Sequence, residues 1–148
     1  MAKPESWRLD RSNYPFETLV STRFQDLDTM GHINNVAMAG LFETGRVHFH
    51  HHIGRHPHDQ GVRWLIAAVN LSYLREAHFP HDISILSGLG RIGNSSWTVL
   101  SAAFQEGHCV ATCDTVVVTQ GPDGRRHITD AVRDALAPFL VSGEYQLA

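Results

Sequence analysis

Hydrophobic and polar positions alternate in two different ways along the chain, and together they predict a strand, one long helix and then a series of strands. Residues 17–25 mix Thr, Leu, Val and Phe as a strand does. Residues 36–53 contain no proline and place apolar or small residues at helical spacing. Four later segments are predicted as strands: 62–74, 83–92, 97–105 and 108–119. A short amphipathic helix is expected over 128–137, capped by Thr129 or Asp130.

The connections between the later strands are rich in turn-forming residues, which is typical of antiparallel hairpins. These connections are residues 79–82, 93–96, 105–107 and 121–124. The order of elements favours an α+β fold in which an antiparallel sheet wraps around one long central helix. The small residues Ala37, Ala39 and Gly40 fit a helix that approaches a sheet closely, and they fit an ordinary core equally well.

Length, net charge and cysteine content limit the number of domains and the kinds of partner that the chain can have. The 148 residues fit one domain, with residues 1–14 expected as a loosely held N-terminal arm. A net charge of −3 offers no basic excess for a nucleic acid partner, and no apolar run is long enough for a signal peptide or a membrane span. We therefore expect a cytoplasmic protein without a membrane partner. Cys109 and Cys113 lie four residues apart on a predicted strand, about 13 Å, so free thiols are expected.

The segment Asp-Leu-Asp-Thr-Met-Gly-His-Ile-Asn-Asn, residues 26–35, concentrates polar chemistry between the first strand and the long helix. Asp, Gly and Asn are common in turns, so a cap and turn explain such a loop without catalysis. For Asp26 we expect hydrogen bonds to loop amides, and for Asn34 the role of helix cap. A helix N-terminus also carries unpaired N–H groups and a partial positive charge, which stabilise a developing oxyanion.

This segment, followed by Leu-Phe-Glu-Thr-Gly-Arg, resembles the hotdog-fold acyl-CoA thioesterases of the 4-hydroxybenzoyl-CoA thioesterase type. The resemblance covers roughly residues 17–138. Its most specific part is the Asp-x-Asp-x-x-Gly-His-x-Asn-Asn pattern at a strand-to-helix junction. The family often has an aromatic residue three positions after the second Asn, where this chain has Met38, and that departure bears on the shape of the acyl pocket.

The resemblance implies hydrolysis of an acyl or aryl thioester to a free acid and coenzyme A. Asp28 would be the nucleophile or the general base, and Asn35 would donate its backbone N–H to the thioester carbonyl. Gly31 would allow a tight turn near the substrate, and His32 would orient Asp28, line the pocket or hold the loop. Glu43 is either an auxiliary carboxylate, as in some members of the family, or the partner of Arg46 in a structural ion pair.

Coenzyme A would be part of the substrate, and no separate cofactor is expected. Its phosphates and pantetheine need donors outside the acyl pocket, and the candidates for substrate binding are Asn70, Arg75, Arg91, Ser95 and Ser96. The alternative is that these arginines and the serine turn are simply exposed to solvent and bind no substrate. The resemblance further implies a homodimer or homotetramer with the active site where two subunits meet, and dimerisation would cover an exposed sheet edge.

Two rival functions and one metal hypothesis remain open at this stage. A related acyl-CoA hydratase or dehydratase generally has a His five residues after the Asp, where this chain has Ile33. A non-catalytic acyl-thioester binding protein is the second rival. The histidines of the segment 48–58 invite a metal site, since His48 and His52 share a helix face, but exposed neutral histidines at a helix end explain the segment without a metal.

Overall fold

The sheet of this protein is antiparallel throughout, and its two longest strands, of 14 and 11 residues, pair with each other at one side of the sheet. The computed structural model describes residues 3–55 and 63–143. The strands are β1 (Phe16–Val20), β2 (Arg63–Tyr73), β3 (Ile83–Ile92), β4 (Ser96–Gln105), β5 (His108–Gly121) and β6 (Gly124–Arg125). Their order is β1-β3-β4-β5-β2, with β6 folded back onto the end of β5. Strand β2 therefore lies at one edge of the sheet and pairs with β5, although β3 and β4 come between these two strands in the chain.

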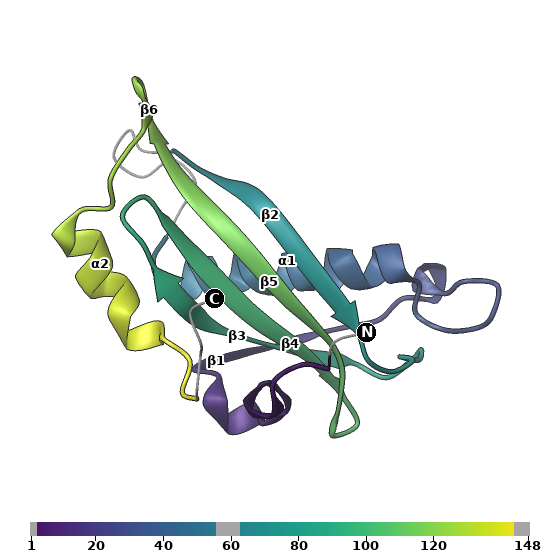
Figure 1. Cartoon of the computed structure of the whole chain (residues 1–148). Coiled ribbons are helices and arrows are strands. Elements are labelled where there is room, and N and C mark those ends of the chain that lie inside the picture. Colours follow the sequence, from purple (N-terminus) through teal and green to yellow (C-terminus); the bar gives the residue numbers. More distant parts are fainter. Residues whose placement is uncertain (1–2, 56–62, 144–148) are drawn as a thin grey trace.

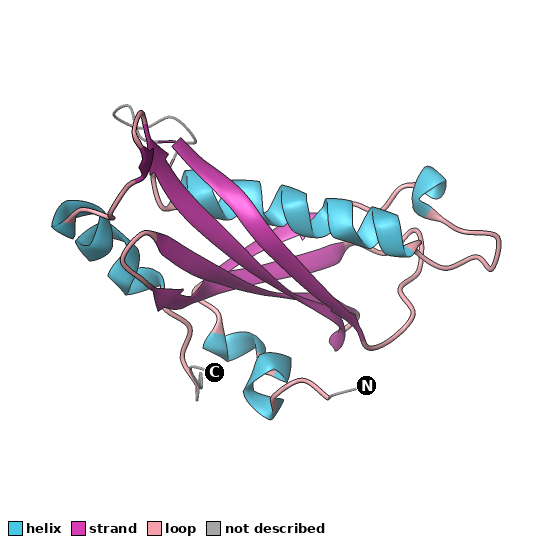
Figure 2. Cartoon of the chain, turned by 45° about the horizontal axis from the view of Figure 1, so that its top comes forward, coloured by secondary structure: helices cyan, strands magenta, loops and turns pink. Residues whose placement is uncertain are grey.

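Helix α1 (Asn35–His52) lies along the inner face of the curled sheet (Figures 1 and 2). Its buried side chains Met38, Leu41 and Phe42 pack in one cluster with Ile85 of β3 and Cys113 of β5. A second helix, α2 (Asp130–Leu136), is capped by Thr129 and covers the far end of the sheet (Figure 1). The predicted α+β architecture, an antiparallel sheet around one long helix, is confirmed.

The first predicted strand is too long at its C-terminal end. Strand β1 ends at Val20, and residues Phe24–Asp26 form a 3-10 turn. The carboxylate of Asp26 accepts the backbone N–H of Arg23 at 2.9 Å and closes that turn. The apolar pattern continued through this segment, but a side-chain bond to the backbone gave the chain an alternative to strand pairing.

The close approach of helix to sheet occurs at Gly45 and not at Gly40. A Cβ added to Gly45 would lie 2.4 Å from the Cγ2 atom of Ile85, whereas one added to Gly40 would meet nothing within 4 Å. Gly40 is exposed on the helix side away from the sheet. The expectation that Gly40 permits close packing is therefore wrong for the single chain, because helical spacing alone does not say which glycine faces β3.

These two glycines form a matched pair for a stability experiment. Gly45→Ala is expected to destabilise the protein by about 1–3 kcal/mol, because Ile85 must move to admit the methyl group. Gly40→Ala is expected to stabilise it by about 0.5–1 kcal/mol, because alanine restricts the unfolded chain in an open helical position. Urea unfolding at pH 7.5 measures both, and equal effects of the two substitutions would contradict the packing at Gly45.

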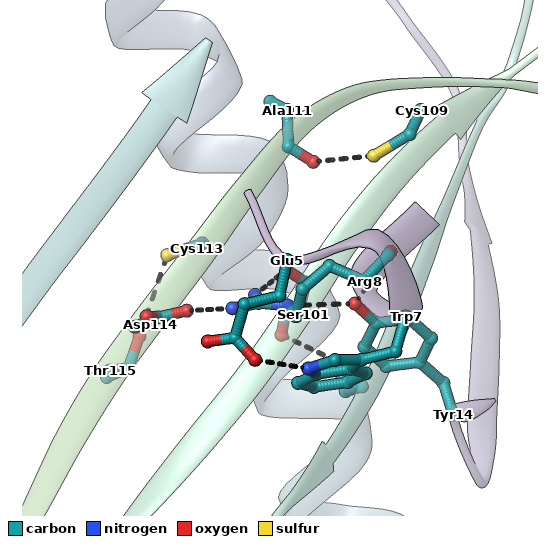
Figure 3. A network of polar contacts seen from close by, with 11 residues as sticks. Glu5, Trp7, Arg8, Tyr14, Ser101, Cys109, Ala111, Cys113, Asp114 and Thr115 are labelled. Atoms are coloured by element: carbon teal, nitrogen blue, oxygen red, sulfur yellow. Dashed lines mark hydrogen bonds and ion pairs between the residues drawn. The ribbon is translucent and has the colours of Figure 1, made fainter. Parts of the chain in front are cut away.

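The N-terminal segment is not the loosely held arm that composition suggested, over the part that the structure describes. Residues Ser6–Leu9 and Arg11–Asn13 form 3-10 turns on the outer face of the sheet, opposite α1 (Figure 2). The buried guanidinium of Arg8 donates to Asp114 at 2.8 Å and to the Ser101 carbonyl at 2.9 Å (Figure 3). The Tyr14 hydroxyl accepts a further bond from Arg8 at 3.0 Å. This anchor explains why the segment packs.

Both cysteines lie on β5 and are free thiols, as predicted. Cys113 packs against α1, while Cys109 packs with the N-terminal segment on the outer face. Burial raises the pKa of the Cys109 thiol to about 11 and also raises that of Cys113. Neither thiol is ionised near neutral pH, which excludes both as nucleophiles in this state.

Candidate functional site

The loop between β1 and α1 is built around the carboxylate of Asp28. Its Oδ1 atom accepts the backbone N–H of Met30 at 2.9 Å and that of His32 at 3.2 Å. The Asp28 backbone N–H donates to the His32 carbonyl, and the Gly31 N–H donates to the Asp28 carbonyl. Gly31 has φ +80°, a left-handed conformation that favours glycine. One carboxylate oxygen thus holds the loop, while Oδ2 has no hydrogen bond among the described residues.

The next two residues of the motif shape the start of α1. Asn34 is the N-cap, and its side-chain oxygen accepts the N–H groups of Val36 at 2.6 Å and Ala37 at 3.3 Å. The Asn35 N–H makes no hydrogen bond within the described parts of the chain, while the Asn35 carbonyl accepts the Tyr73 hydroxyl at 3.0 Å. The cap therefore leaves the Asn35 N–H of the first turn without a hydrogen-bond partner among the described residues.

A cavity of about 310 Å³ brings Asp28 and Asn35 together. It lies between the motif loop, the first turn of α1 and the segment that follows β2. Its lining residues are Asp28, His32, Ile33, Asn35, Met38, Tyr73, Leu74, Arg75, Glu76 and Ala77. The volume is at the lower end of the range for small-molecule sites. The residues of this one cavity thus include an acidic side chain, that of Asp28, and a residue with an unpaired helical N–H, Asn35. Acyl transfer can use both kinds of group.

Two polar residues of this cavity were not found by sequence reasoning. Tyr73 and Glu76 come from the end of β2 and the segment after it, and Glu76 Oε2 lies 3.1 Å from Nε2 of His32. That contact ties the motif loop to the strand, so the His32 ring holds the loop and lines the cavity, while only its backbone N–H reaches Asp28. Local sequence carries no signal for a pairing that depends on how β2 docks. Met38, the departure from the family pattern, forms part of the cavity wall.

Asp26 is buried and has a structural place in the loop. Burial acts to raise the pKa of its carboxyl, but hydrogen bonds and charge from Arg23 outweigh it and lower the pKa overall. The Arg23 guanidinium lies 2.9 Å from Asp26 Oδ1. The Asp26 carbonyl also accepts the Asn34 N–H at 2.8 Å, which fixes the end of the loop against its start. The Asp26 side chain thus accepts a hydrogen bond from a backbone amide of the loop, that of Arg23, as predicted. Asp26 does not line the cavity.

Glu43 lies outside the cavity on the exposed side of α1. Its side chain is 74% exposed, and its Oε2 lies 3.9 Å from the guanidinium of Arg46. Arg46 in turn donates to the Thr115 hydroxyl at 3.3 Å. Within one chain Glu43 is not among the residues that line the cavity with Asp28, and its contact with Arg46 fits the structural ion pair, while an auxiliary catalytic role stays a prediction.

The fold places some of the predicted substrate-binding residues at the cavity and others away from it. Arg75 lines the cavity with Asp28. Asn70 is paired with Asp114, and Asp114 meets Arg8 on the outer face of the sheet, so Asn70 points away from the cavity. The expectation that Asn70 faces the site is wrong within one chain, because the register of β2 against β5 sets its face.

The turn between β3 and β4 lies at the opposite end of the sheet from the cavity. Ser96 is paired with Val118, and Tyr73 is paired with Ala111. Seven residues along β5 correspond to about 23 Å. Ser95 is buried in the turn, and its carbonyl accepts the Thr119 N–H at 3.0 Å. Arg91, Ser95 and Ser96 therefore do not join Asp28 within one chain.

The histidines of the segment 48–58 that the structure describes lie in different environments. His50 is buried beside Trp97, and the ring of His52 lies 4.8 Å from that of Phe16. His56 and His58 lie outside the described residues. Across residues 3–55 and 63–143, no group of three or more His, Cys, Asp or Glu side chains is arranged to hold a metal ion. Within the same ranges, no helix is both long and apolar enough to cross a membrane.

Comparison with known proteins identifies the class to which this fold belongs. The PA5185 protein from Pseudomonas aeruginosa strain PAO1 is 30% identical, with a TM-score of 0.79 over 92% of this chain and 98% of that one. A predicted thioesterase from Bacillus stearothermophilus is 27% identical, with a TM-score of 0.75 over 86% and 98% of the two chains. A thioesterase from Thermus thermophilus, complexed with coenzyme A and Zn, shares the fold at 22% identity and a TM-score of 0.76, over 86% and 95%. The architecture is the hotdog fold.

The sequence profile of the Thioesterase-like superfamily matches residues 22–136, and the chain belongs to that family. The match spans the motif loop, α1 and the whole sheet after β1. Among curated proteins, the uncharacterized protein YsmA of Bacillus subtilis (strain 168) is 26% identical over 89 residues, which is 60% of this chain and 60% of YsmA. The chain thus matches less than two thirds of that curated relative.

Proposed function

We propose that this protein hydrolyses an acyl-CoA thioester to a free acid and coenzyme A. The observation that carries the proposal is the cavity lined by both Asp28 and Asn35, whose backbone N–H has no hydrogen-bond partner among the described residues. Membership of the Thioesterase-like superfamily and the likeness to proteins called thioesterases support the reaction class. The resemblance of the motif to the 4-hydroxybenzoyl-CoA thioesterase type supports the same assignment of roles.

In the proposed reaction the thioester carbonyl oxygen accepts the Asn35 N–H at the positive end of α1. As the carbon becomes tetrahedral, negative charge develops on that oxygen, and the helix N-terminus stabilises it. Losing one such donor costs on the order of 3 kcal/mol in other enzymes. The Asn34 cap supports this role because it satisfies Val36 and Ala37 and leaves Asn35 unpaired.

Asp28 acts on the opposite side of the carbonyl through one of two routes. As a general base it takes a proton from water, the hydroxide forms a bond to the carbonyl carbon, and the C–S bond breaks to release the thiolate of coenzyme A, which is then protonated. As a nucleophile its carboxylate displaces that thiolate to form a mixed anhydride, which water hydrolyses. The free Oδ2 atom serves either route, because Oδ1 is held by the loop amides.

Arg75 is the proposed contact for the coenzyme A part of the substrate. Its side chain lines the cavity and is exposed, so it can meet a phosphate at the rim. Arg91, Ser95 and Ser96 can serve the same site only if a second subunit brings them there. We propose no further cofactor, since hydrolysis of a thioester needs only water, an acid–base group and an oxyanion donor.

Release of free thiol from a panel of acyl-CoA and aryl-CoA substrates tests the proposed function. The proposal expects a thiol stoichiometric with the acid produced, and the panel identifies the preferred acyl group. Tight binding of every substrate without thiol release would favour the non-catalytic binding protein. Hydration without thiol release would favour the lyase, although the position where such lyases have a His is occupied by Ile33, which is buried in the core.

We propose that two copies associate through the edge strand β2 to form a homodimer. Val69 on the inner face of β2 is 48% exposed, and Val36 on the neighbouring side of α1 is 79% exposed. A second copy pairing with β2 would continue the sheet and cover these apolar side chains. The cavity lies beside this edge, since Tyr73 ends β2, so the partner would complete its wall.

Substituting Val69 by Glu tests the dimer. A buried unpaired charge at the interface is expected to convert the protein to a monomer and to reduce thiol release in parallel. Size-exclusion chromatography with light scattering at about 20 μM gives the mass. Leu19→Glu is the matched control, because Leu19 is 65% exposed on the opposite edge strand β1. A wild-type monomer, or a Val69→Glu protein of unchanged mass, would overturn the proposed interface.

A further inference from the structure

The protein has a second cavity, of about 300 Å³, at the far end of α1 from the motif loop. Trp64 at the start of β2 lines it, whereas Tyr73 at the end of the same strand lines the first cavity. Nine residues of strand separate them by about 30 Å. The second cavity is almost as large as the first one, and the proposed hydrolysis does not use it within one chain.

Aromatic side chains form one wall of this cavity. Trp64 and Trp97 both line it, with ring centroids 6.1 Å apart. The ring of His50 supports them from inside the core, 4.5 Å from Trp64. Because Trp97 is almost fully buried and hydrogen-bonded to His50, its position is held by the core. Trp64 is half-buried and offers its indole to a planar ring, while Trp97, whose ring is tilted by 58° from it, supports Trp64 from the core.

Two arginines are among the described residues that line this cavity. Arg55, which follows the end of α1, and Arg126, which follows β6, are both lining residues. The Arg55 Nε atom is buried and has no hydrogen-bond partner among the residues that the structure describes. Arg126 has no ion pair within the described parts of the chain, and none of the described residues that line the cavity is acidic. A buried unsatisfied guanidinium N–H is costly, and an anionic ligand would satisfy it.

The backbone around Arg126 is held in place by bonds to the sheet. The Arg126 N–H donates to the Thr119 carbonyl at 3.2 Å, and the Thr119 hydroxyl donates to the Arg126 carbonyl. Two residues later, the Ile128 N–H donates to the Asn94 carbonyl at 2.7 Å. The segment that carries Arg126 therefore needs little ordering when a ligand binds, which favours affinity.

We infer that this second cavity binds a small planar aromatic anion. Its ring lies against Trp64, which Trp97 supports from the core, and its negative group is bound by Arg55 and Arg126. The volume suits a ligand of one or two rings. Two sources provide this chemistry: an aryl carboxylate, and the adenine nucleotide end of a coenzyme such as coenzyme A.

Isothermal titration calorimetry on the full chain tests the inference with 2-naphthoate and 3′-AMP as separate probes. At least one is expected to bind with a Kd of about 1 mM or tighter. Arg55→Gln and Arg126→Gln are each expected to weaken that binding at least about tenfold, as loss of a charge-assisted bond does. The probe that binds identifies the source, the carboxylate or the nucleotide. Arg125→Gln is the matched control, because Arg125 is adjacent in sequence and is not a lining residue.

Three results would overturn the inference: no saturable binding of either probe, equal binding of the neutral analogue 2-naphthylmethanol, or unchanged affinity in both arginine variants. Thermal unfolding of each variant reports whether the fold is intact. The titration is repeated with Asp28→Asn, in which the proposed hydrolysis is disabled. Retained binding there separates the second cavity from the hydrolytic site, so failure of one proposal is distinguishable from failure of the other.

Discussion

Asp28→Asn is expected to reduce thiol release roughly a hundredfold to ten-thousandfold, the range that loss of a general base produces. The substitution removes the charge and the basic oxygen but keeps an oxygen atom that can accept the Met30 and His32 N–H groups. The loop should therefore keep its shape. The fall should appear in kcat with little change in KM, since the lost interaction acts on the reacting centre.

Two further variants make this result specific. Asp82→Asn alters an exposed carboxylate outside the cavity and should leave kcat unchanged. Glu76→Gln alters the other acidic side chain of the cavity and should have a smaller effect than Asp28→Asn, since its carboxylate is engaged by His32. A full loss in Glu76→Gln with activity retained in Asp28→Asn would assign the chemistry to Glu76 and contradict the proposed role of Asp28.

Stability is expected to fall by about 2 kcal/mol between pH 8 and pH 5 through His50 alone, and by about 3 kcal/mol once the pH is below 4. Burial is the main cause that lowers the pKa of His50 to about 4. Its Nδ1 atom donates to the Arg46 carbonyl at 3.0 Å, and its Nε2 atom accepts the Trp97 indole N–H at 3.1 Å. Both nitrogens are satisfied only in the neutral ring, because a proton on Nε2 would face the indole N–H.

The direction of this pH dependence follows from the number of protons that the folded and the unfolded protein bind. Between pH 6.5 and 4 the unfolded chain binds a proton at His50 that the folded protein does not, so the free energy of unfolding falls as the pH falls through this window. Urea unfolding at several pH values measures it. His50→Gln should flatten this dependence whatever its effect at pH 8. His48→Gln, on the exposed side of the same helix, should keep the wild-type dependence. An unchanged slope in His50→Gln would contradict a neutral buried ring.

Much of the fold was predictable because its signals are local. The long helix and the later strands follow from apolar spacing, and the observed β3 begins and ends at the predicted residues. The Asn34 cap and the left-handed Gly31 turn also depend on neighbouring residues alone. The end of the first strand at Val20 was harder to predict, since the turn after it is closed by hydrogen bonds between Asp26 and Arg23 and not by an apolar pattern.

The sequence by itself determined the order of elements, the fold class and the motif that links a carboxylate to a helix N-terminus. Only the tertiary structure decided which distant residues meet: Arg8 with Asp114, 106 positions apart, or Glu76 with His32. It also decided that Gly45 faces the sheet and that Asn70 points to the outer face. The physical reason is that periodicity and capping act over a few residues, whereas the register of β2 and the docking of α1 depend on packing across the whole chain.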